Sequence, residues 1–191
     1  MTYDYSNAPP DLIPKGTRVA ISMHIRAGGV GEDGMCKRSE KGAEMLDNEF
    51  TVLDGEYAKR KWWENWILDG PDDGHKQMAI RYRRMLKLIL DSALGLDPDD
   101  MTPQARVART VSLKRFDGMC FIAEIGIKKG DGDWPDKNVI TRIITKGGQD
   151  WRPVQPPPFD GGGSAGSAAA PPQSVPPQPE SPVSRPGWAQ S

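Results

Sequence analysis

Hydrophobic and polar residues alternate most clearly between residues 46 and 68. From 46 to 52, the even-numbered positions are mostly apolar and the odd-numbered positions are polar, which is the period of two expected for a strand with one buried face. A second strand is predicted from 61 to 68. Asp54-Gly55 lies between the two and supplies a turn, because glycine readily adopts the positive φ that such connections need. The stretch therefore predicts a β-hairpin.

The second strand of this hairpin begins where a basic triplet meets two adjacent tryptophans. Lys59, Arg60 and Lys61 run directly into Trp62 and Trp63. Neighbouring residues of a strand point to opposite faces, so only one tryptophan of the pair can enter the core. An exposed tryptophan among cations is suited to stacking an unpaired base and holding its phosphate. The alternation favours the core for Trp62 and places Trp63 opposite the buried set, and we keep both as candidate contacts.

The remaining elements follow from the same kind of periodicity. We predict a strand at 15–26, a long amphipathic helix at 75–94, a short helix at 102–110, and strands at 119–129 and 138–146. The order along the chain is therefore three strands, two helices and two strands. Five short strands interrupted by a helical segment indicate a small closed or partly open β-barrel rather than a parallel sheet.

Two changes in composition divide the chain. Residues 1–14 carry prolines and tyrosines without periodicity and are predicted to be an irregular lead-in. The domain is predicted to span 15–152. Residues 153–191 are almost wholly Pro, Gly, Ser, Ala and Gln, cannot bury enough apolar surface to offset the loss of chain entropy, and are predicted to be a disordered tail. Trp188, near the end of that tail, is either incidental or part of a short peptide segment that binds a partner protein.

Charge and cysteine usage narrow the class of protein. The 191 residues carry a net charge of −1, so any nucleic acid would be held by a local basic stripe rather than by a global field. The two cysteines lie far apart and support neither a disulfide framework nor a zinc site. No apolar run approaches the roughly 20 residues that span a bilayer, and the N-terminus lacks the features of a signal peptide. We expect a soluble, cytoplasmic protein that does not contact membranes.

Catalytic signatures are missing from the sequence. The only histidines, His24 and His75, have no neighbours at metal-ligand spacing, and the common nucleophile, phosphate-loop and zinc-protease motifs are absent. We therefore expect a binding protein rather than an enzyme, with no catalytic residues, cofactor or metal.

The candidate binding face combines the polar sides of the strands with the basic triplet. Asp47, Glu49 and Glu64 would repel phosphate, so the predicted groove must avoid them. The candidate nucleic-acid-binding residues are Arg18, His24, Arg26, Lys59, Arg60, Lys61, Trp62, Trp63, Lys128, Arg142 and Lys146.

One family resemblance bears on these residues. The run Asp-Gly-Glu-Tyr-Ala-Lys-Arg-Lys at 54–61, the basic helix after it, and the later runs FDGMCFIAEIGIKKGD and NVITRI resemble phage-encoded proteins catalogued as a domain of unknown function. The family has glycine where this chain has Lys59, and its late asparagine is matched by Asn138. The tail ending in Pro-Gly-Trp-Ala is also similar. The resemblance covers 15–152 and the tail, and implies an OB-fold-like protein that binds single-stranded DNA and is encoded near replication and recombination genes.

Together these features predict a mainly β protein: an OB-fold-like β-barrel with an inserted α-helical segment and a disordered C-terminal tail. We expect it to bind single-stranded DNA without sequence preference in phage or prophage replication or recombination, inside the bacterial host cell, with the tail recruiting replication or recombination proteins. A homo-oligomer is left open. Two alternatives remain, namely a protein–protein adaptor of a phage replication machine in which Trp63 anchors the interface, and a metal-dependent nuclease or nucleotide hydrolase that uses the acidic turns.

Overall fold

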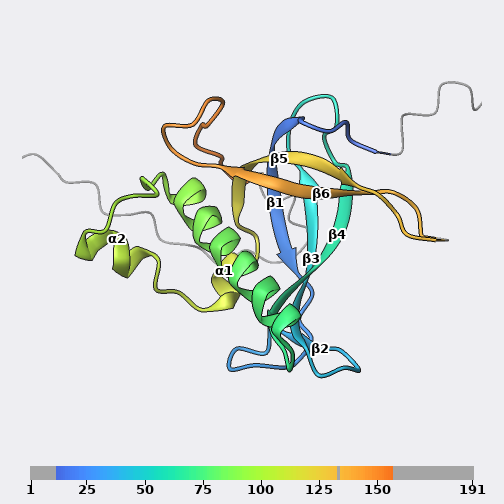
Figure 1. Cartoon of the computed structure of the whole chain (residues 1–191). Coiled ribbons are helices and arrows are strands. Elements are labelled where there is room, and N and C mark those ends of the chain that lie inside the picture. The colour runs from blue at the N-terminus through green and yellow to red at the C-terminus, as the bar shows by residue number, and fades with distance from the viewer. Residues whose placement is uncertain (1–11, 133, 157–191) are drawn as a thin grey trace, which may run out of the picture. The chain divides into compact units, whose positions relative to one another are not determined.

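A computed structural model describes residues 12–132 and 134–156 of the chain (Figure 1). Trp188, the lead-in up to residue 11 and the predicted tail from residue 157 lie outside the described residues. The elements, in chain order, are β1 (Arg18–Ile25), β2 (Lys37–Arg38), β3 (Glu44–Val52), β4 (Lys61–Asp69), α1 (Asp73–Leu94), α2 (Pro103–Ala108), a 3₁₀ turn η1 (Leu113–Phe116), β5 (Cys120–Lys128) and β6 (Lys137–Ile144).

The strands form one antiparallel sheet in the order β4–β3–β1–β5–β6, and the short β2 pairs with the start of β3. The predicted hairpin is confirmed as β3 and β4, with Phe50 opposite Trp62 and Glu49 opposite Trp63. Among the described residues no backbone ladder joins β4 to β6, so the sheet curves without closing into a hydrogen-bonded barrel. The mainly β prediction is confirmed, whereas barrel closure is not.

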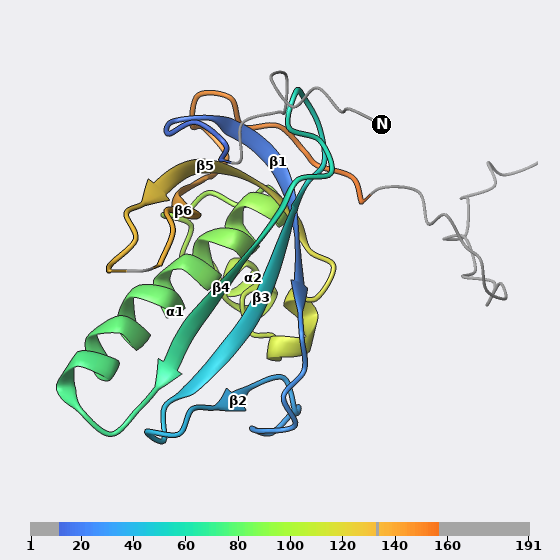
Figure 2. The same cartoon turned by 90° about the vertical axis from the view of Figure 1, so that its right-hand side faces the viewer.

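The long helix α1 lies against the inner side of the sheet, where it contacts β4, β5 and β6 (Figures 1 and 2). Asp72 caps its N-terminus by accepting a hydrogen bond from the backbone N–H of His75 at 2.8 Å. Gly95 ends it in the left-handed conformation at φ +64°, as a C-terminal glycine favours. The buried apolar side chains of α1 are Ala79, Leu86, Ile89 and Leu90. The helix therefore covers the open side of the curved sheet.

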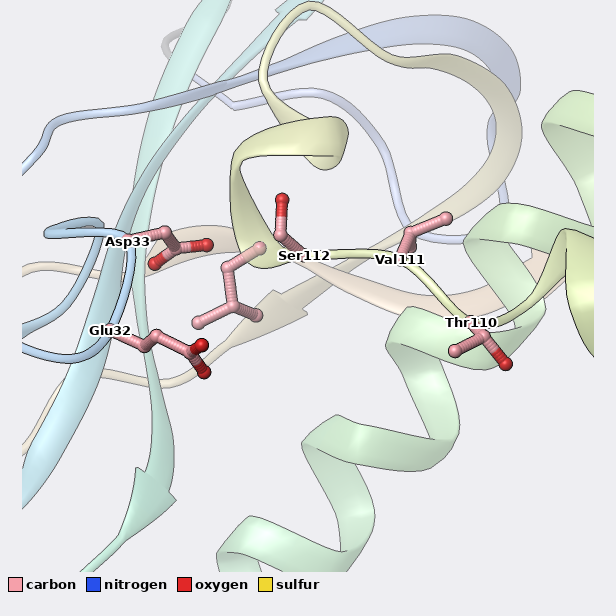
Figure 3. A pocket seen from close by; sticks show the side chains of 6 residues that line it. Glu32, Asp33, Thr110, Val111 and Ser112 are labelled. Atoms are coloured by element: carbon pink, nitrogen blue, oxygen red, sulfur yellow. The ribbon is translucent and has the colours of Figure 1, made fainter.

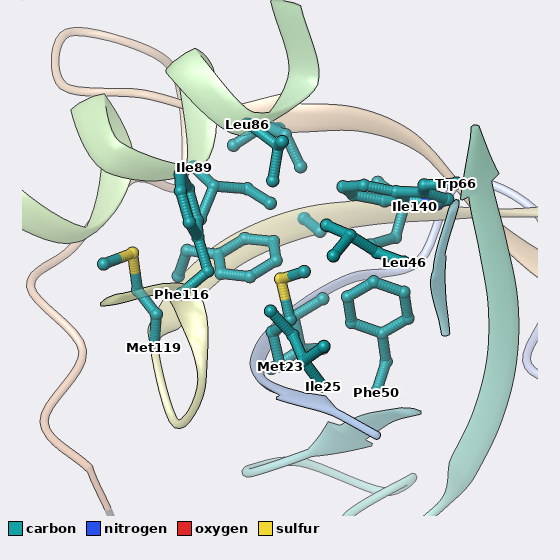
Figure 4. Packing of buried hydrophobic residues seen from close by; sticks show 14 of the residues in the cluster. Met23, Ile25, Leu46, Phe50, Trp66, Leu86, Ile89, Phe116, Met119 and Ile140 are labelled. Carbon is teal, nitrogen blue, oxygen red and sulfur yellow. The ribbon is translucent and has the colours of Figure 1, made fainter. Parts of the chain in front are cut away.

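The hydrophobic core lies between the inner face of the sheet and α1 (Figure 4). Phe50 is fully buried, and its ring lies 5.4 Å from that of Trp62 and 5.5 Å from that of Trp66. Trp66 also stacks on Tyr82 of α1, with 5.3 Å between the ring centroids. Offset aromatic contacts at these separations stabilise a core beyond simple area burial. Alternate residues of the hairpin therefore join the sheet to the helix.

Two polar side chains of the hairpin enter this core. Glu64 is 8% exposed, and its carboxylate accepts hydrogen bonds from the indole N–H groups of Trp62 at 3.0 Å and Trp66 at 3.1 Å. A third donor is the backbone N–H of Ile140 in β6, at 2.8 Å. Asn48, directly opposite Glu64 in the β3–β4 register, is fully buried, and its amide has no hydrogen-bond partner among the described residues.

The folded region is longer than the sequence predicts at both ends. Ile13 is buried, its N–H donates to Oδ1 of Asn138 at 2.8 Å, and its carbonyl accepts from Nδ2 of the same side chain at 2.8 Å. Near the other end, Trp151 and Val154 pack on a second apolar cluster formed by Ala20 and two isoleucines. Residues within the predicted lead-in and within the first part of the predicted tail are thus part of the packed fold.

The connection from β3 to β4 contains a non-glycine residue in the left-handed region. Lys59 has φ +70°, and its N–H donates to the carbonyl of Val52 at 2.8 Å. Gly55, in the same connection, has φ +73°. The backbone at 59 thus adopts the conformation that glycine favours, although the residue is a lysine.

No helix among the described residues is both long enough and apolar enough to cross a lipid bilayer.

Candidate nucleic-acid interface

Three outward-facing side chains form a row across the sheet. His24 of β1, Glu49 of β3 and Trp63 of β4 occupy directly opposed positions in adjacent ladders. Alternation along each strand turns their neighbours inward, so these three point away from the core. They lie on the outer face of β3 and β4, which is the surface predicted from the tryptophan pair. In Figure 2 the molecule is turned so that these two strands face the viewer, with α1 beside and behind them.

Trp63 is the exposed member of the tryptophan pair. Its side chain is 48% exposed, whereas Trp62 is 6% exposed and belongs to the core. We therefore leave Trp62 out of the proposed interface, because a ring packed against Phe50 offers no face to a base. The indole N–H of Trp63 donates to Oε2 of Glu49 at 3.1 Å, which restrains the ring on the outer surface.

Glu49 holds two side chains of β4 at once. Oε1 accepts from Nζ of Lys61 at 2.6 Å, while Oε2 accepts from Trp63. The hydrogen bond from Lys61 and, after it, that from Trp63 keep the pKa of Glu49 below its usual value in spite of partial burial. Glu49 is therefore a carboxylate at neutral pH, and it occupies the centre of the face from which phosphate-repelling groups were expected to be absent.

Asp47, two residues before Glu49 on the same face of β3, forms ion pairs with two cations. Arg26 approaches Oδ1 at 2.6 Å, and Lys37 approaches Oδ2 at 2.9 Å. Burial raises the pKa of Asp47, but the hydrogen bonds from Lys37 and Arg26 outweigh it, so the pKa is lowered. Arg26 is thus an ion-pair partner within the protein, which reduces the positive charge that it offers to a phosphate.

A second group of candidates lies around Glu124 on the other part of the sheet. Arg18 contacts Glu124 at 3.1 Å and Asp150 at 2.6 Å, and Arg142 contacts the same Glu124 oxygen at 2.8 Å. The hydrogen bond from Arg18 is the main reason that the pKa of Glu124 is lowered. Arg18 and Arg142 therefore lie close to each other, but their charges are neutralised by Glu124 and Asp150. They are not grouped with Trp63.

The remaining candidates occupy loops and strand ends. Lys59 and Lys146 are exposed in turns, and the guanidinium of Arg60 lies over the ring of Tyr57 at 5.7 Å. His24 is exposed, and its Nδ1 lies 2.7 Å from Oδ1 of Asp117. The predicted set is therefore distributed over several parts of the surface, and only the residues near Trp63 share one face.

The connection between β5 and β6 carries an aromatic residue that the sequence analysis overlooked. Trp134 is 79% exposed and lines a cavity of about 420 Å³ together with Lys128, Lys129 and Lys137. Lys128 and Lys137 are opposed at the base of the hairpin, and neither has an ion-pair partner among the described residues. The same signal, a tryptophan among lysines, was present in the sequence, but the acidic residues of this turn made it read as a solvated loop.

A separate cavity of about 680 Å³ lies between the β1–β2 connection and the segment before η1 (Figure 3). Glu32 and Asp33 from the β1–β2 connection face Val111 and Ser112 across it. Two carboxylates and no aromatic side chain make this cavity unsuited to a nucleic acid. Across residues 12–132 and 134–156, no group of three or more potential metal-binding side chains is present.

No protein-family model matches the chain, and no curated protein is similar to it in sequence.

Proposed function

We propose that this protein binds single-stranded DNA on the outer face of β3 and β4, with a base stacked on Trp63. The observation that carries the proposal is a half-exposed indole restrained at its N–H by Glu49 and flanked by Lys61. Stacking of one base on an aromatic side chain is worth about 1–3 kcal/mol and is tolerated by every base. A pre-positioned ring avoids part of the entropy loss that binding would otherwise impose.

The order of the strands supports an OB-type assignment. If β1, β3, β4, β5 and β6 are taken as five barrel strands, the long helix follows the third, and the sheet is partly open. OB-folds bind oligonucleotides on the face of their second and third strands and with the loops that flank it. In this chain that face is β3 and β4, where Trp63 lies, and the loop between the fourth and fifth strands carries Trp134.

The proposed phosphate contacts come from cations in two separate regions. Lys59 and Arg60 lie at the β3–β4 turn, and Lys128 and Lys137 lie at the base of the β5–β6 connection beside Trp134. Arg18, Arg26 and Arg142 contribute less, because carboxylates within the protein already neutralise them. Binding therefore depends more on stacking than on charge. From the family resemblance we further propose that this binding serves phage or prophage replication or recombination, and that the tail and Trp188 recruit partner proteins.

The decisive experiment is a titration of the full chain with a mixed-sequence oligonucleotide of about 16 nucleotides, the upper end of site sizes for one OB fold. Tryptophan fluorescence and anisotropy of a labelled oligonucleotide are followed together. We expect quenching on binding, and a Trp63→Ala variant that binds about thirtyfold more weakly, the mid-range of one lost stacking contact.

Two variants serve as controls. Trp63→Phe keeps an aromatic face and should retain most of the affinity, and Val107→Ala truncates an exposed residue of α2, away from the face, and should change nothing. Circular dichroism checks that each variant is folded. Equal affinity of Trp63→Ala and the unaltered protein would place the DNA elsewhere, and no binding at low salt would refute DNA binding altogether.

One observation favours a second candidate function. The carboxylates of Asp47 and Glu49 make the outer face nearly neutral, which suits an interface with another protein in which Trp63 is the buried anchor. The titration separates the two functions, because an adaptor would show no affinity for the oligonucleotide at low salt.

A further inference from the structure

Glu49 places a hydrogen-bond acceptor at the edge of the stacking surface. Each of its carboxylate oxygens accepts one hydrogen bond within the protein, Oε1 from Lys61 and Oε2 from Trp63. A carboxylate offers about four lone-pair sites. Each oxygen therefore retains capacity for one further donor, and the side chain is 18% exposed, so it is reachable from solvent.

A base stacked on Trp63 brings its edge close to this carboxylate, because the indole N–H itself points to Oε2. Bases differ in what that edge presents. Guanine has two adjacent donors, N1–H and the N2 amino group, which match the two oxygens of a carboxylate. Cytosine and adenine each present an amino donor beside an acceptor nitrogen. Thymine presents its single N3–H between two carbonyl oxygens, which a carboxylate repels.

We propose that Glu49 is a specificity-determining residue that selects guanine at the position stacked on Trp63. The inference rests on the proposed function and narrows it, since stacking alone would accept any base. Thymine offers no pair of adjacent donors, and the carbonyl oxygens on either side of its N3–H repel the carboxylate. A carboxylate desolvated by stacked thymine therefore loses hydrogen bonds to water without replacing them, which is the penalty that discriminates against thymine. The hydrogen bond from Lys61 keeps Glu49 ionised, so it remains an acceptor.

Asp47 provides the internal comparison. Like Glu49, it is an outward carboxylate of β3 with two hydrogen-bond partners, here Arg26 and Lys37, but it stands opposite Asn65 rather than opposite an exposed ring. A base stacked on Trp63 therefore meets Glu49 and not Asp47. Removal of either charge should raise the general affinity for DNA to a similar extent, whereas only removal of Glu49 should change the preference among bases.

The experiment compares three oligonucleotides of one length: dT only, alternating dG and dT, and alternating deoxyinosine and dT. It is carried out in lithium salt to prevent guanine tetrads. Deoxyinosine differs from deoxyguanosine only in lacking the N2 amino group. We expect the dG-dT strand to bind about tenfold tighter than dT, the value of one good paired contact to a base edge, and the deoxyinosine strand to fall between them.

Glu49→Gln is the test variant and Asp47→Asn its matched control. We expect Glu49→Gln to bind dT more tightly than the unaltered protein and to lose the preference for dG-dT, while Asp47→Asn keeps that preference. An unchanged preference in Glu49→Gln, or equal binding of all three strands by the unaltered protein, would overturn the assignment of Glu49 while leaving DNA binding intact. Failure to bind any strand would instead refute the proposed function.

Discussion

Oε1 of Glu64 accepts a hydrogen bond from the backbone N–H of Ile140 at 2.8 Å, and this contact joins the two outer strands of the sheet. No backbone ladder connects β4 to β6 among the described residues, so one buried side chain performs part of the role that strand pairing performs in a closed barrel. The same carboxylate also satisfies two indole N–H groups, which places three donors on one acceptor in the core.

Substitution of Glu64 should therefore destabilise the fold without affecting the outer face. Glu64→Ala leaves three buried donors without a partner, and we expect a loss of about 3–5 kcal/mol in the free energy of unfolding. Glu64→Gln keeps the shape and one acceptor oxygen and should lose about 1–2 kcal/mol. Urea denaturation followed by circular dichroism measures both. A loss below 1 kcal/mol for the alanine variant would contradict the role assigned to this carboxylate.

The same residue should give stability an unusual dependence on pH. Burial is the main influence on the pKa of Glu64 and raises it above 4.5, although hydrogen bonds from Trp62, Ile140 and Trp66 oppose the shift. The folded state then binds the proton more tightly than the unfolded state. The stability linked to this proton is complete below the unfolded pKa of 4.5 and is lost as pH rises through the raised folded pKa.

The measurement is the difference in unfolding free energy between the unaltered protein and Glu64→Gln, from about pH 4 to about pH 8. We expect this difference to shrink as pH rises, because only Glu64 is removed and the other carboxylates cancel. A difference that grows with pH would mean that the hydrogen bonds outweigh burial and that the pKa is lowered.

Asn48 should be replaceable with a gain in stability. Its buried amide has no partner among the described residues, so the folded protein bears the full desolvation penalty. We expect Asn48→Leu to raise the free energy of unfolding by about 1 kcal/mol. Asn138→Leu is the matched control, because Asn138 is also buried but bonds to Ile13 and Gly126. That variant should lose about 2–4 kcal/mol, and a loss in Asn48→Leu as well would reveal a hidden partner for the amide.

Lys59→Gly should stabilise the β3–β4 turn. A left-handed conformation costs a non-glycine residue about 1–2 kcal/mol. Glycine removes this cost, but part of the gain is lost because glycine also raises the conformational entropy of the unfolded chain. We expect a net gain of about 0.5–1 kcal/mol, measured by thermal unfolding. Ala58→Gly, one residue away and without a positive φ, should give a loss. Equal effects at 58 and 59 would show that the local conformation is not the cause.

Salt dependence should distinguish free from paired cations. For single-stranded DNA the logarithm of the binding constant falls with the logarithm of salt concentration by about 0.7 per phosphate contact. We expect Lys128→Gln and Lys137→Gln each to reduce that slope by about 0.7, and Arg18→Gln to leave it unchanged because Arg18 is held by Glu124 and Asp150. A reduced slope for Arg18→Gln would indicate that this ion-pair network opens when DNA binds.

The sequence predicts the elements well and the electrostatics poorly, and the reason is physical. Alternation fixes which side of a strand is buried, so the assignment of Trp62 to the core and Trp63 to the surface follows from the period of two. Ion pairs depend on which strands become neighbours. The predicted groove was expected to avoid Asp47 and Glu49, but the register places Glu49 opposite Trp63 and diagonal to Lys61.

The buried polar contacts could not be predicted for the same reason. The period of two places Glu64 on the same inward face as Trp62 and Trp66. Its partner Ile140 is 76 residues away, and no local pattern indicates which distant strand the carboxylate will contact. Trp134 was missed although its lysine neighbours were visible, because the acidic residues around it are typical of solvated turns. A tryptophan in a turn, at a position without strand periodicity, is itself the signal that would have identified it.

The two hydrogen bonds between Ile13 and Asn138 join residues that are 125 positions apart, and the one between Arg18 and Glu124 joins residues that are 106 apart. Contacts at such separations form slowly, because a long loop must close before they are gained. During synthesis from the N-terminus, β1 can pair with β3 long before β5 has been made. Until then, the edge of β1 that later pairs with β5 has no partner strand. The nascent chain is therefore most prone to aggregate before β5 and β6 have been translated, and the fold completes only with the last strand.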